Sequence, residues 1–147
     1  MTASLFLSIA LAATGLYKTT LDYAEKKTSL EQPMLAFVES HKSTGDVYLI
    51  PTDLQDFRLV TGAPVYVEFK SIPYKDSDVI EWYRRINAAG KLYRAPTKRA
   101  GCRLLSELYL EGVTHAVLPY DHTVKNCSNL VIQYVDMNYQ VYQIIEE

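Results

Sequence analysis

The chain has 147 residues, of which 48% are hydrophobic and 22% charged, which suits one small globular domain with one additional element. The formal net charge of −2 gives no whole-molecule reason for binding nucleic acid, so we do not expect a nucleic-acid partner. The two cysteines, Cys102 and Cys127, form no C-x-x-C pair, which excludes a zinc ribbon or redox motif of that kind. Whether one disulfide joins them stays open.

The N-terminus carries a long uncharged stretch. From Met1 to Tyr17 the run just reaches the lower limit of about 17 apolar residues for a membrane-spanning helix, with Tyr17 and Lys18 placed as interfacial anchors. We therefore expect a single-pass membrane protein that is held in the membrane through residues 1–17. Two alternatives stay open, namely a cleaved signal peptide and a buried core helix.

The sequence suggests a division into residues 1–27, a hydrophobic helix with a juxtamembrane extension, and residues 28–147, an α/β domain. The side of the membrane on which the domain lies is ambiguous. Lys18, Lys26 and Lys27 favour the cytoplasmic side, but this local rule weakens if further spans precede the chain.

Apolar periodicity predicts elements in the order β-α-β-α-α-β-β-β after the helical N-terminal region. The predicted helices are residues 18–44 with a new start at Ser29, 53–60, 78–94 and 97–112. The predicted strands are residues 46–51, 64–69, 115–120, 129–135 and 139–145. The expected capping residues are Asp53 and Asp78 at helix starts, and Gly45, Gly62 and Gly112 after helix ends.

This order predicts the fold class. Because the first three strands alternate with helices, we expect an α/β domain with a small, mostly parallel sheet flanked by helices. The last two strands add an antiparallel hairpin at the C-terminus, and the hydrophobic helix precedes the whole.

The basic residues are concentrated in one part of the chain. No acid lies between Glu81 and Glu107, and this interval with its ends holds seven basic residues. They are Arg84, Arg85, Lys91, Arg94, Lys98, Arg99 and Arg103. Such a patch can bind a phosphate, a lipid head group or an anionic membrane surface. The alternative is a solvated face in which Arg85 pairs with Glu81 one helical turn back.

A second group of polar residues lies near predicted strand ends, where ligands bind in open α/β sheets. Its members are Asp53, Asp56, Arg58, Lys70 and Tyr74. They predict a polar site, with local capping and ion pairing as the alternative. From both groups we select five ligand-binding candidates: Arg58, Lys70, Tyr74, Arg84 and Arg85. The four cations would engage an anionic group, and Tyr74 would stack or hydrogen-bond beside it.

Motifs for catalysis or cofactors do not stand out. The chain has no G-x-G-x-x-G, no Walker loop and no G-x-S-x-G. His115, His122 and Cys127 do not have the spacing of a zinc site. We therefore expect no metal, no cofactor and no catalytic residues, and we expect that this chain alone is not an enzyme.

Four stretches carry a resemblance to a known kind of domain. They are YLIPTDLQDFR (48–58), TGAPVYV (61–67), KSIPY (70–74) and EWYRR (81–85). Together they resemble the C-terminal soluble domain, with the last transmembrane helix, of uncharacterised bacterial polytopic membrane proteins. Those proteins are similar in layout to lipid-linked-sugar glycosyltransferases, whose catalytic carboxylate lies in an early membrane loop that this chain lacks.

The expected function is that of a membrane-tethered, non-catalytic α/β domain that recognises an anionic ligand or a membrane-protein partner. The alternative implied by the resemblance is a C-terminal fragment of a glycosyltransferase-like membrane protein that acts on lipid-linked sugars.

Overall fold

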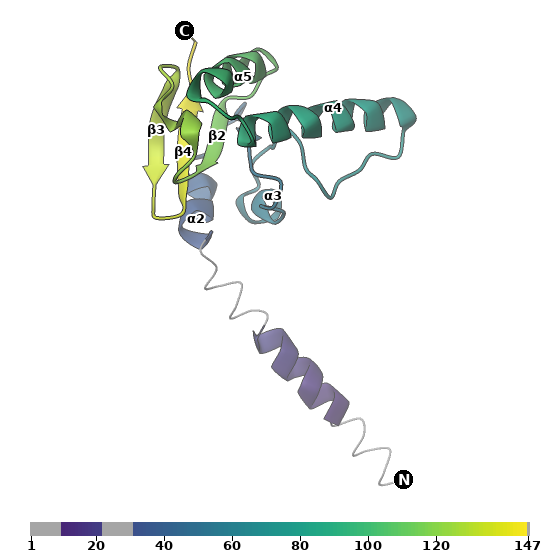
Figure 1. Cartoon of the computed structure of the whole chain (residues 1–147). Coiled ribbons are helices and arrows are strands. Elements are labelled where there is room, and N and C mark those ends of the chain that lie inside the picture. Colours follow the sequence, from purple (N-terminus) through teal and green to yellow (C-terminus); the bar gives the residue numbers. More distant parts are fainter. Residues whose placement is uncertain (1–9, 22–30, 147) are drawn as a thin grey trace, which may run out of the picture. The chain divides into compact units, whose positions relative to one another are not determined.

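The computed structural model describes residues 10–21 and 31–146, and the chain divides into two compact units, Met1–Gln32 and Pro33–Glu147 (Figure 1). In the first unit, residues 10–21 are helical. Among the helices of the described ranges, none combines the length and the apolar character needed to cross a bilayer. The first nine residues of the expected membrane span, the predicted helix start at Ser29, and Lys26 and Lys27 lie outside the described residues.

The second unit contains four α-helices, one 3₁₀-helix and four strands within the described residues. The helices are α2 (Gln32–His41), α3 (Phe57–Thr61), α4 (Asp76–Tyr93), α5 (Lys98–Leu110) and the 3₁₀-helix η1 (Thr123–Asn126). The strands are β1 (Tyr48–Leu49), β2 (His115–Pro119), β3 (Leu130–Val135) and β4 (Tyr139–Ile144).

The four strands form one mixed sheet in the order β1-β2-β4-β3. Only β1 and β2 are parallel, whereas β4 is antiparallel to both β2 and β3. The α/β class and the C-terminal hairpin are confirmed, but the prediction of a mostly parallel sheet is wrong. The predicted order placed the hairpin as an extension at the side, whereas β4 pairs directly with β2 and makes antiparallel pairing dominant.

The predicted strand at residues 64–69 is also wrong. Its only ladder contact in the described structure is an isolated parallel bridge between Tyr48 and Val65. Beyond this bridge, side chains of α4 bind the carbonyl oxygens that a strand partner would need. Arg85 donates to the carbonyl of Tyr66 at 3.2 Å, and Trp82 donates through Nε1 to that of Glu68 at 2.8 Å. The alternation of apolar residues there reflects partial burial, since Val65 and Val67 pack against different parts of the core.

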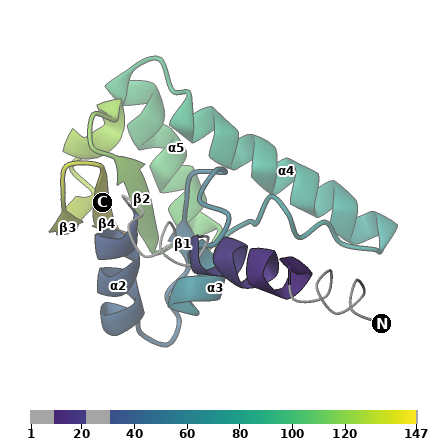
Figure 2. The same ribbon diagram turned by 90° about the horizontal axis from the view of Figure 1, so that it is seen from below.

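Two clusters of buried side chains make up the core, one on each face of the sheet, and β2 contributes to both. Leu118 lies with Leu92 of α4 and Leu105 of α5, whereas Val117 lies with Met34 of α2. Figure 2 shows α2 and α5 on opposite sides of β2 and β4. The side-chain alternation of a strand thus divides β2 between two helical layers.

The helix ends follow local chemistry in most places. Gly62 ends α3 with the positive φ of 64° that glycine adopts without strain. Thr97 caps α5 by accepting a hydrogen bond from the backbone N–H of Ala100. The expected cap at Asp78 is wrong, because α4 begins at Asp76 and its N-cap residue is Lys75, which makes no side-chain cap. Asp78 instead lies in the first turn, where the helix dipole favours a carboxylate.

Candidate anion-binding site

The turn between α4 and α5 is tightly packed. Ala95 is buried, and Gly101 in the first turns of α5 lies against Val124 of η1. A Cβ atom at Gly101 would lie 1.8 Å from Cγ1 of Val124, so only glycine fits at this position without a shift. The beginning of α5 therefore lies in direct contact with η1, the segment that follows β2.

A disulfide between Cys102 and Cys127 joins α5 to the residue after η1. It closes a loop with a sequence separation of 25 and a Cα–Cα distance of 5.5 Å. Together with the Gly101 contact, it fixes the start of α5 to the structure behind it. The sequence left open whether these two cysteines form a disulfide, and the structure contains it.

Four cations surround this turn, and we call them the basic turn: Lys91, Arg94, Lys98 and Arg99. All four side chains are exposed. In the described part of the chain none of them forms an ion pair, whereas Arg103, one turn further on, pairs with Glu107 at 3.0 Å. Lys98 and Arg99 occupy the first turn of α5, which contains no acidic residue. Their charges therefore add to the positive end of the helix dipole instead of compensating it.

The basic turn lies near the carboxyl ends of the two parallel strands. Tyr93, the last residue of α4, donates its hydroxyl to the carbonyl of Val117 in β2 at 2.8 Å. His122, which follows β2, has its Nε2 3.4 Å from the carbonyl oxygen of Tyr93. Burial and the negative charge of Asp53, which follows β1, raise the pKa of Tyr93 well above its usual range. The helix cap predicted at Asp53 is wrong, because α3 begins at Phe57 and its N-cap residue is Asp56.

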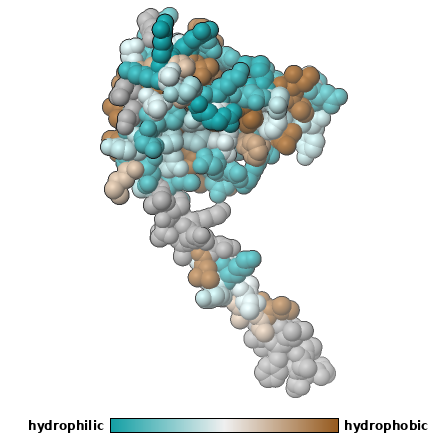
Figure 3. Space-filling view, viewed as in Figure 1, coloured by the Kyte–Doolittle hydropathy of each residue, from teal (hydrophilic) through white to brown (hydrophobic). Residues whose placement is uncertain are grey.

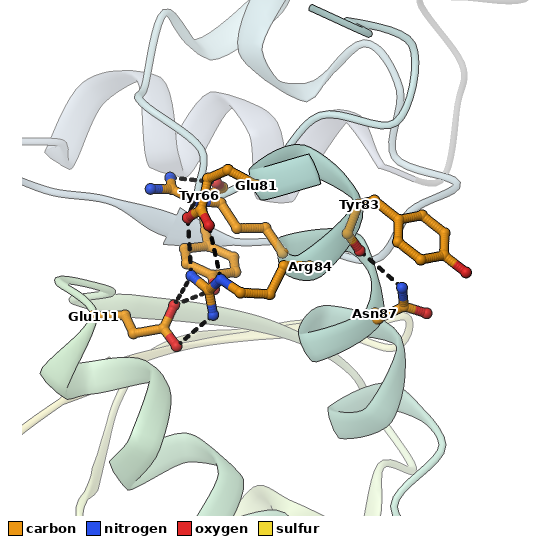
Figure 4. Close-up of polar contacts among 7 residues, drawn as sticks. Tyr66, Glu81, Tyr83, Arg84, Asn87 and Glu111 are labelled. Atoms are coloured by element: carbon orange, nitrogen blue, oxygen red, sulfur yellow. Dashed lines mark hydrogen bonds and ion pairs between the residues drawn. The ribbon is translucent and has the colours of Figure 1, made fainter. Parts of the chain in front are cut away.

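Two of the predicted ligand-binding residues, Arg84 and Arg85, belong instead to a compact ionic network (Figure 4). We call it the Arg84 network, and its members are Tyr66, Glu81, Arg84, Arg85 and Glu111. Arg84 bonds Glu111 through two nitrogens at 2.8 and 2.7 Å, and it bonds both oxygens of Glu81 at 2.8 and 2.9 Å. Arg85 donates to Glu81 at 2.7 Å, as the alternative interpretation predicted.

Tyr66 completes the network. Its hydroxyl donates to Glu111, and its ring lies under Arg85, whose Cζ is 5.1 Å from the ring centroid. Hydrogen bonds from Arg84 and Arg85 lower the pKa of Glu81 to about 2, and the bond from Arg84 lowers the pKa of Glu111. Burial, followed by the bond to Glu111, raises the pKa of Tyr66 to about 12. Two carboxylates thus neutralise two guanidinium groups, which leaves little attraction for an anionic ligand.

The other three predicted residues are not brought together with these arginines. Arg58 lies 3.7 Å from Glu68, which also accepts a hydrogen bond from Ser71. Lys70 and Tyr74 are exposed in the loop before α4, and neither has a hydrogen bond or ion pair within the described residues. The five candidates therefore do not form one site.

No cluster of three or more His, Cys, Asp or Glu side chains in the described ranges could hold a metal ion. His115 stacks on Tyr48 with ring centroids 4.7 Å apart, and its Nδ1 lies 2.9 Å from the hydroxyl of Thr114. Burial lowers the pKa of His115. His122 and Cys127 flank η1. His122 accepts a hydrogen bond from the backbone N–H of Val124, and Cys127 forms the disulfide with Cys102 of α5.

Two features of these regions escaped sequence reasoning. Glu111 was not connected with Arg84, because 27 residues separate them and no short-range pattern joins them. The 3₁₀-helix η1 was not predicted, because it has no apolar period of its own. The sequence nevertheless contains a weak signal for its contact with α5. Gly101 is an interior glycine in a predicted helix, which indicates a close approach of another segment.

Comparisons with known proteins add little about function. A family model described as a domain of unknown function (DUF6798) matches residues 30–89, which include α2, β1, α3 and most of α4. No curated protein and no solved structure matches the chain.

Proposed function

We propose that the α/β domain is a non-catalytic recognition domain that binds an anionic ligand at the basic turn, and that residues 1–17 tether it to a membrane. One observation carries the ligand proposal: the exposed cations Lys91, Arg94, Lys98 and Arg99 have no ion pairs in the described part of the chain. Two of them, Lys98 and Arg99, lie at a helix start that is held in place by a disulfide.

The electrostatics of α5 support this proposal. A cation in the first turn of a helix is unfavourable, because it meets the partial positive charge of the unpaired N–H groups. Thr97 accepts from the N–H of Ala100, whereas the N–H groups of Lys98 and Arg99 have no acceptor within the described residues. An anion at this position would interact with the side-chain charges and with the helix end together.

The position in the fold adds a second argument. In open α/β sheets, ligands bind outside the carboxyl ends of parallel strands. Tyr93 connects the end of α4 to β2, and Asp53 follows β1. The basic turn therefore lies near the parallel pair formed by β1 and β2, which is the part of the mixed sheet to which this rule applies. A fragment of a glycosyltransferase-like protein stays the alternative, and no contact in the described structure favours it.

Titration of the full chain with inorganic pyrophosphate tests the proposal. Backbone amide resonances in residues 98–101 should shift, and the affinity should fall as salt is added. The variant Lys98→Ala/Arg99→Ala should lose about 100-fold or more in affinity, because each of its two charge-assisted contacts contributes about 1.5–3 kcal/mol.

Arg103→Ala is the matched control, since Arg103 lies on the same helix but is paired with Glu107. It should bind as the unmodified chain does. Equal losses in both variants would show a general charge effect and would overturn the assignment, as would resonances that do not move in the unmodified chain.

A further inference from the structure

The loop before α4 exposes apolar side chains between two lysines. We call residues 69–75 the apolar loop, which reads Phe-Lys-Ser-Ile-Pro-Tyr-Lys. Phe69 is 51% exposed, Ile72 is 57% exposed, and Tyr74 is fully exposed. Figure 3 shows hydrophobic side chains in brown among hydrophilic ones over the α4 region of this face. Apolar side chains grouped in this way indicate an interaction site more often than scattered ones do.

The loop is held in position by α4. Trp82 donates through Nε1 to the carbonyl oxygen of Glu68 at 2.8 Å, and its ring centroid lies 6.5 Å from that of Phe69. Pro73 restricts the backbone between Ile72 and Tyr74. The exposed side chains are therefore presented from an anchored loop, which lowers the entropy cost of a contact.

The charges of the loop favour one kind of surface. Lys70 and Lys75 are exposed and form no ion pair with any described residue. The preceding acid, Glu68, is occupied by Arg58 and Ser71. The following acids, Asp76 and Asp78, lie in the first turn of α4, where they compensate the helix dipole. Within the loop itself the charge is thus entirely positive.

We infer that the apolar loop docks on an anionic lipid surface. Ile72 and Tyr74 enter the interface, and Lys70 and Lys75 lie against the head groups. Tyrosine is favoured at membrane–water interfaces because its ring is apolar and its hydroxyl stays hydrated. Lysines beside a weakly inserting apolar segment supply the second attraction that stable membrane binding needs. The contact does not depend on the pyrophosphate site, which lies on residues 91–99.

The test places a fluorophore in the loop of the full chain. Tyr74→Trp is mixed with vesicles of phosphatidylcholine containing phosphatidylglycerol, with and without bromine on the acyl chains. The expected results are a blue-shifted emission of the introduced tryptophan and its quenching by the brominated lipid, beyond any change of the native Trp82. Because this signal arises in the loop, it reports insertion of the loop itself, also in a chain that residues 1–17 hold on the vesicle.

Substitutions then separate charge from apolar contact. In the Tyr74→Trp chain, Lys70→Gln/Lys75→Gln should weaken docking about 25-fold, or about fivefold per lysine. Ile72→Ser should also weaken it, whereas Leu110→Ser, at a position 85% exposed on α5, should not. An introduced tryptophan that brominated lipid does not quench, or an equal effect of Leu110→Ser, would overturn the inference. So would docking that is lost in Lys98→Gln/Arg99→Gln but kept in the loop variant, which would assign the membrane contact to the basic turn.

Discussion

The Arg84 network and the basic turn belong to one run of basic residues, yet they are in opposite electrostatic states. Arg84 and Arg85 share Glu81 and Glu111, and every charge in that network has a partner within 3 Å. The cations of the basic turn are exposed, and none of them has an ion-pair partner among the described residues. A basic residue is therefore a ligand candidate only where no carboxylate from elsewhere in the fold reaches it.

The two regions are also stabilised by different means. The Arg84 network joins α4, the 64–69 segment and the end of α5 through exposed or half-exposed ion pairs, which are individually weak. The basic turn has no such pairs among the described residues and depends on the Gly101 contact and the Cys102–Cys127 disulfide. This contrast predicts that the turn is broken by changes in packing and covalent structure, and the network by changes in charge.

The largest expected effect follows from removing the disulfide. Cys102→Ala/Cys127→Ala should lower the free energy of unfolding by about 3.5 kcal/mol, because the cross-link restricts a loop of 25 residues in the unfolded chain. Urea unfolding measures the loss, and reduction of the unmodified chain should reproduce it. Pyrophosphate affinity should fall as well, since the start of α5 loses its attachment. An unchanged unfolding midpoint after reduction would contradict this account of the turn.

The next largest effect is on stability, and it should have opposite signs for alanine substitutions at two helical glycines. Gly101→Ala should destabilise the protein by about 1–3 kcal/mol, since the new methyl group would overlap Val124. Gly90→Ala is the matched control, because its Cβ would meet only the guanidinium of Arg94 at 3.0 Å, the mobile end of a long side chain. This control should be neutral or stabilising by about 0.5–1 kcal/mol, as alanine is favoured over glycine in helices. Thermal unfolding of both variants checks the contrast.

Much of this architecture was accessible from the sequence. The Thr97 start of α5 and the C-terminal hairpin follow from capping and periodicity, which act over a few residues. The sheet order did not follow, because the pairing of β4 with β2 is a tertiary choice between distant segments. For the same reason, the pairing of Glu111 with Arg84 and of Cys102 with Cys127 could not be predicted.

The five ligand-binding candidates were selected by residue type and by position along the chain. The basic run from Arg84 to Arg103 was recognised, but the residues selected from it, Arg84 and Arg85, are the ones that carboxylates neutralise. Residues of the same charge differ here through neighbours that no local pattern reveals. Lys70 and Tyr74 are exposed, but they lie in the apolar loop and not beside the arginines.

A smaller effect distinguishes the basic turn from the Arg84 network, because substitutions in the two regions should change stability and pyrophosphate binding in opposite ways. Lys98→Ala/Arg99→Ala should raise the free energy of unfolding by about 0.3–1 kcal/mol per charge, since it relieves repulsion at the helix start, while pyrophosphate binding is lost. Arg84→Ala should do the reverse, because it leaves Glu81 and Glu111 beside one another without their shared partner, while binding is kept. Urea unfolding and pyrophosphate titration of the same two variants measure both quantities. Loss of stability in the first variant would show that its cations have structural partners.

The smallest effect is a dependence on pH that the Arg84 network should show and the cations of the basic turn should not. The pKa of Glu81 is lowered from 4.5 to about 2 by its bonds to Arg84 and Arg85, so its stabilising contribution is complete above pH 4.5 and is lost as the pH falls towards 2. The pKa of Tyr66 is raised from 10.0 to about 12, so its contribution is complete below pH 10 and is lost between 10 and 12.

The measurement that isolates this dependence is the urea midpoint of the unmodified chain minus that of Glu81→Gln, followed from pH 5 to pH 2. Glutamine cannot ionise, so the difference should shrink as Glu81 becomes protonated in the folded chain. Lys98→Ala/Arg99→Ala supplies the matched comparison, and its difference from the unmodified chain should stay constant over the same range, since those cations have no carboxylate partner among the described residues to titrate. If the two differences instead shrank together, the acid sensitivity would belong to the whole domain, and the distinction between a neutralised network and an open basic turn would fail.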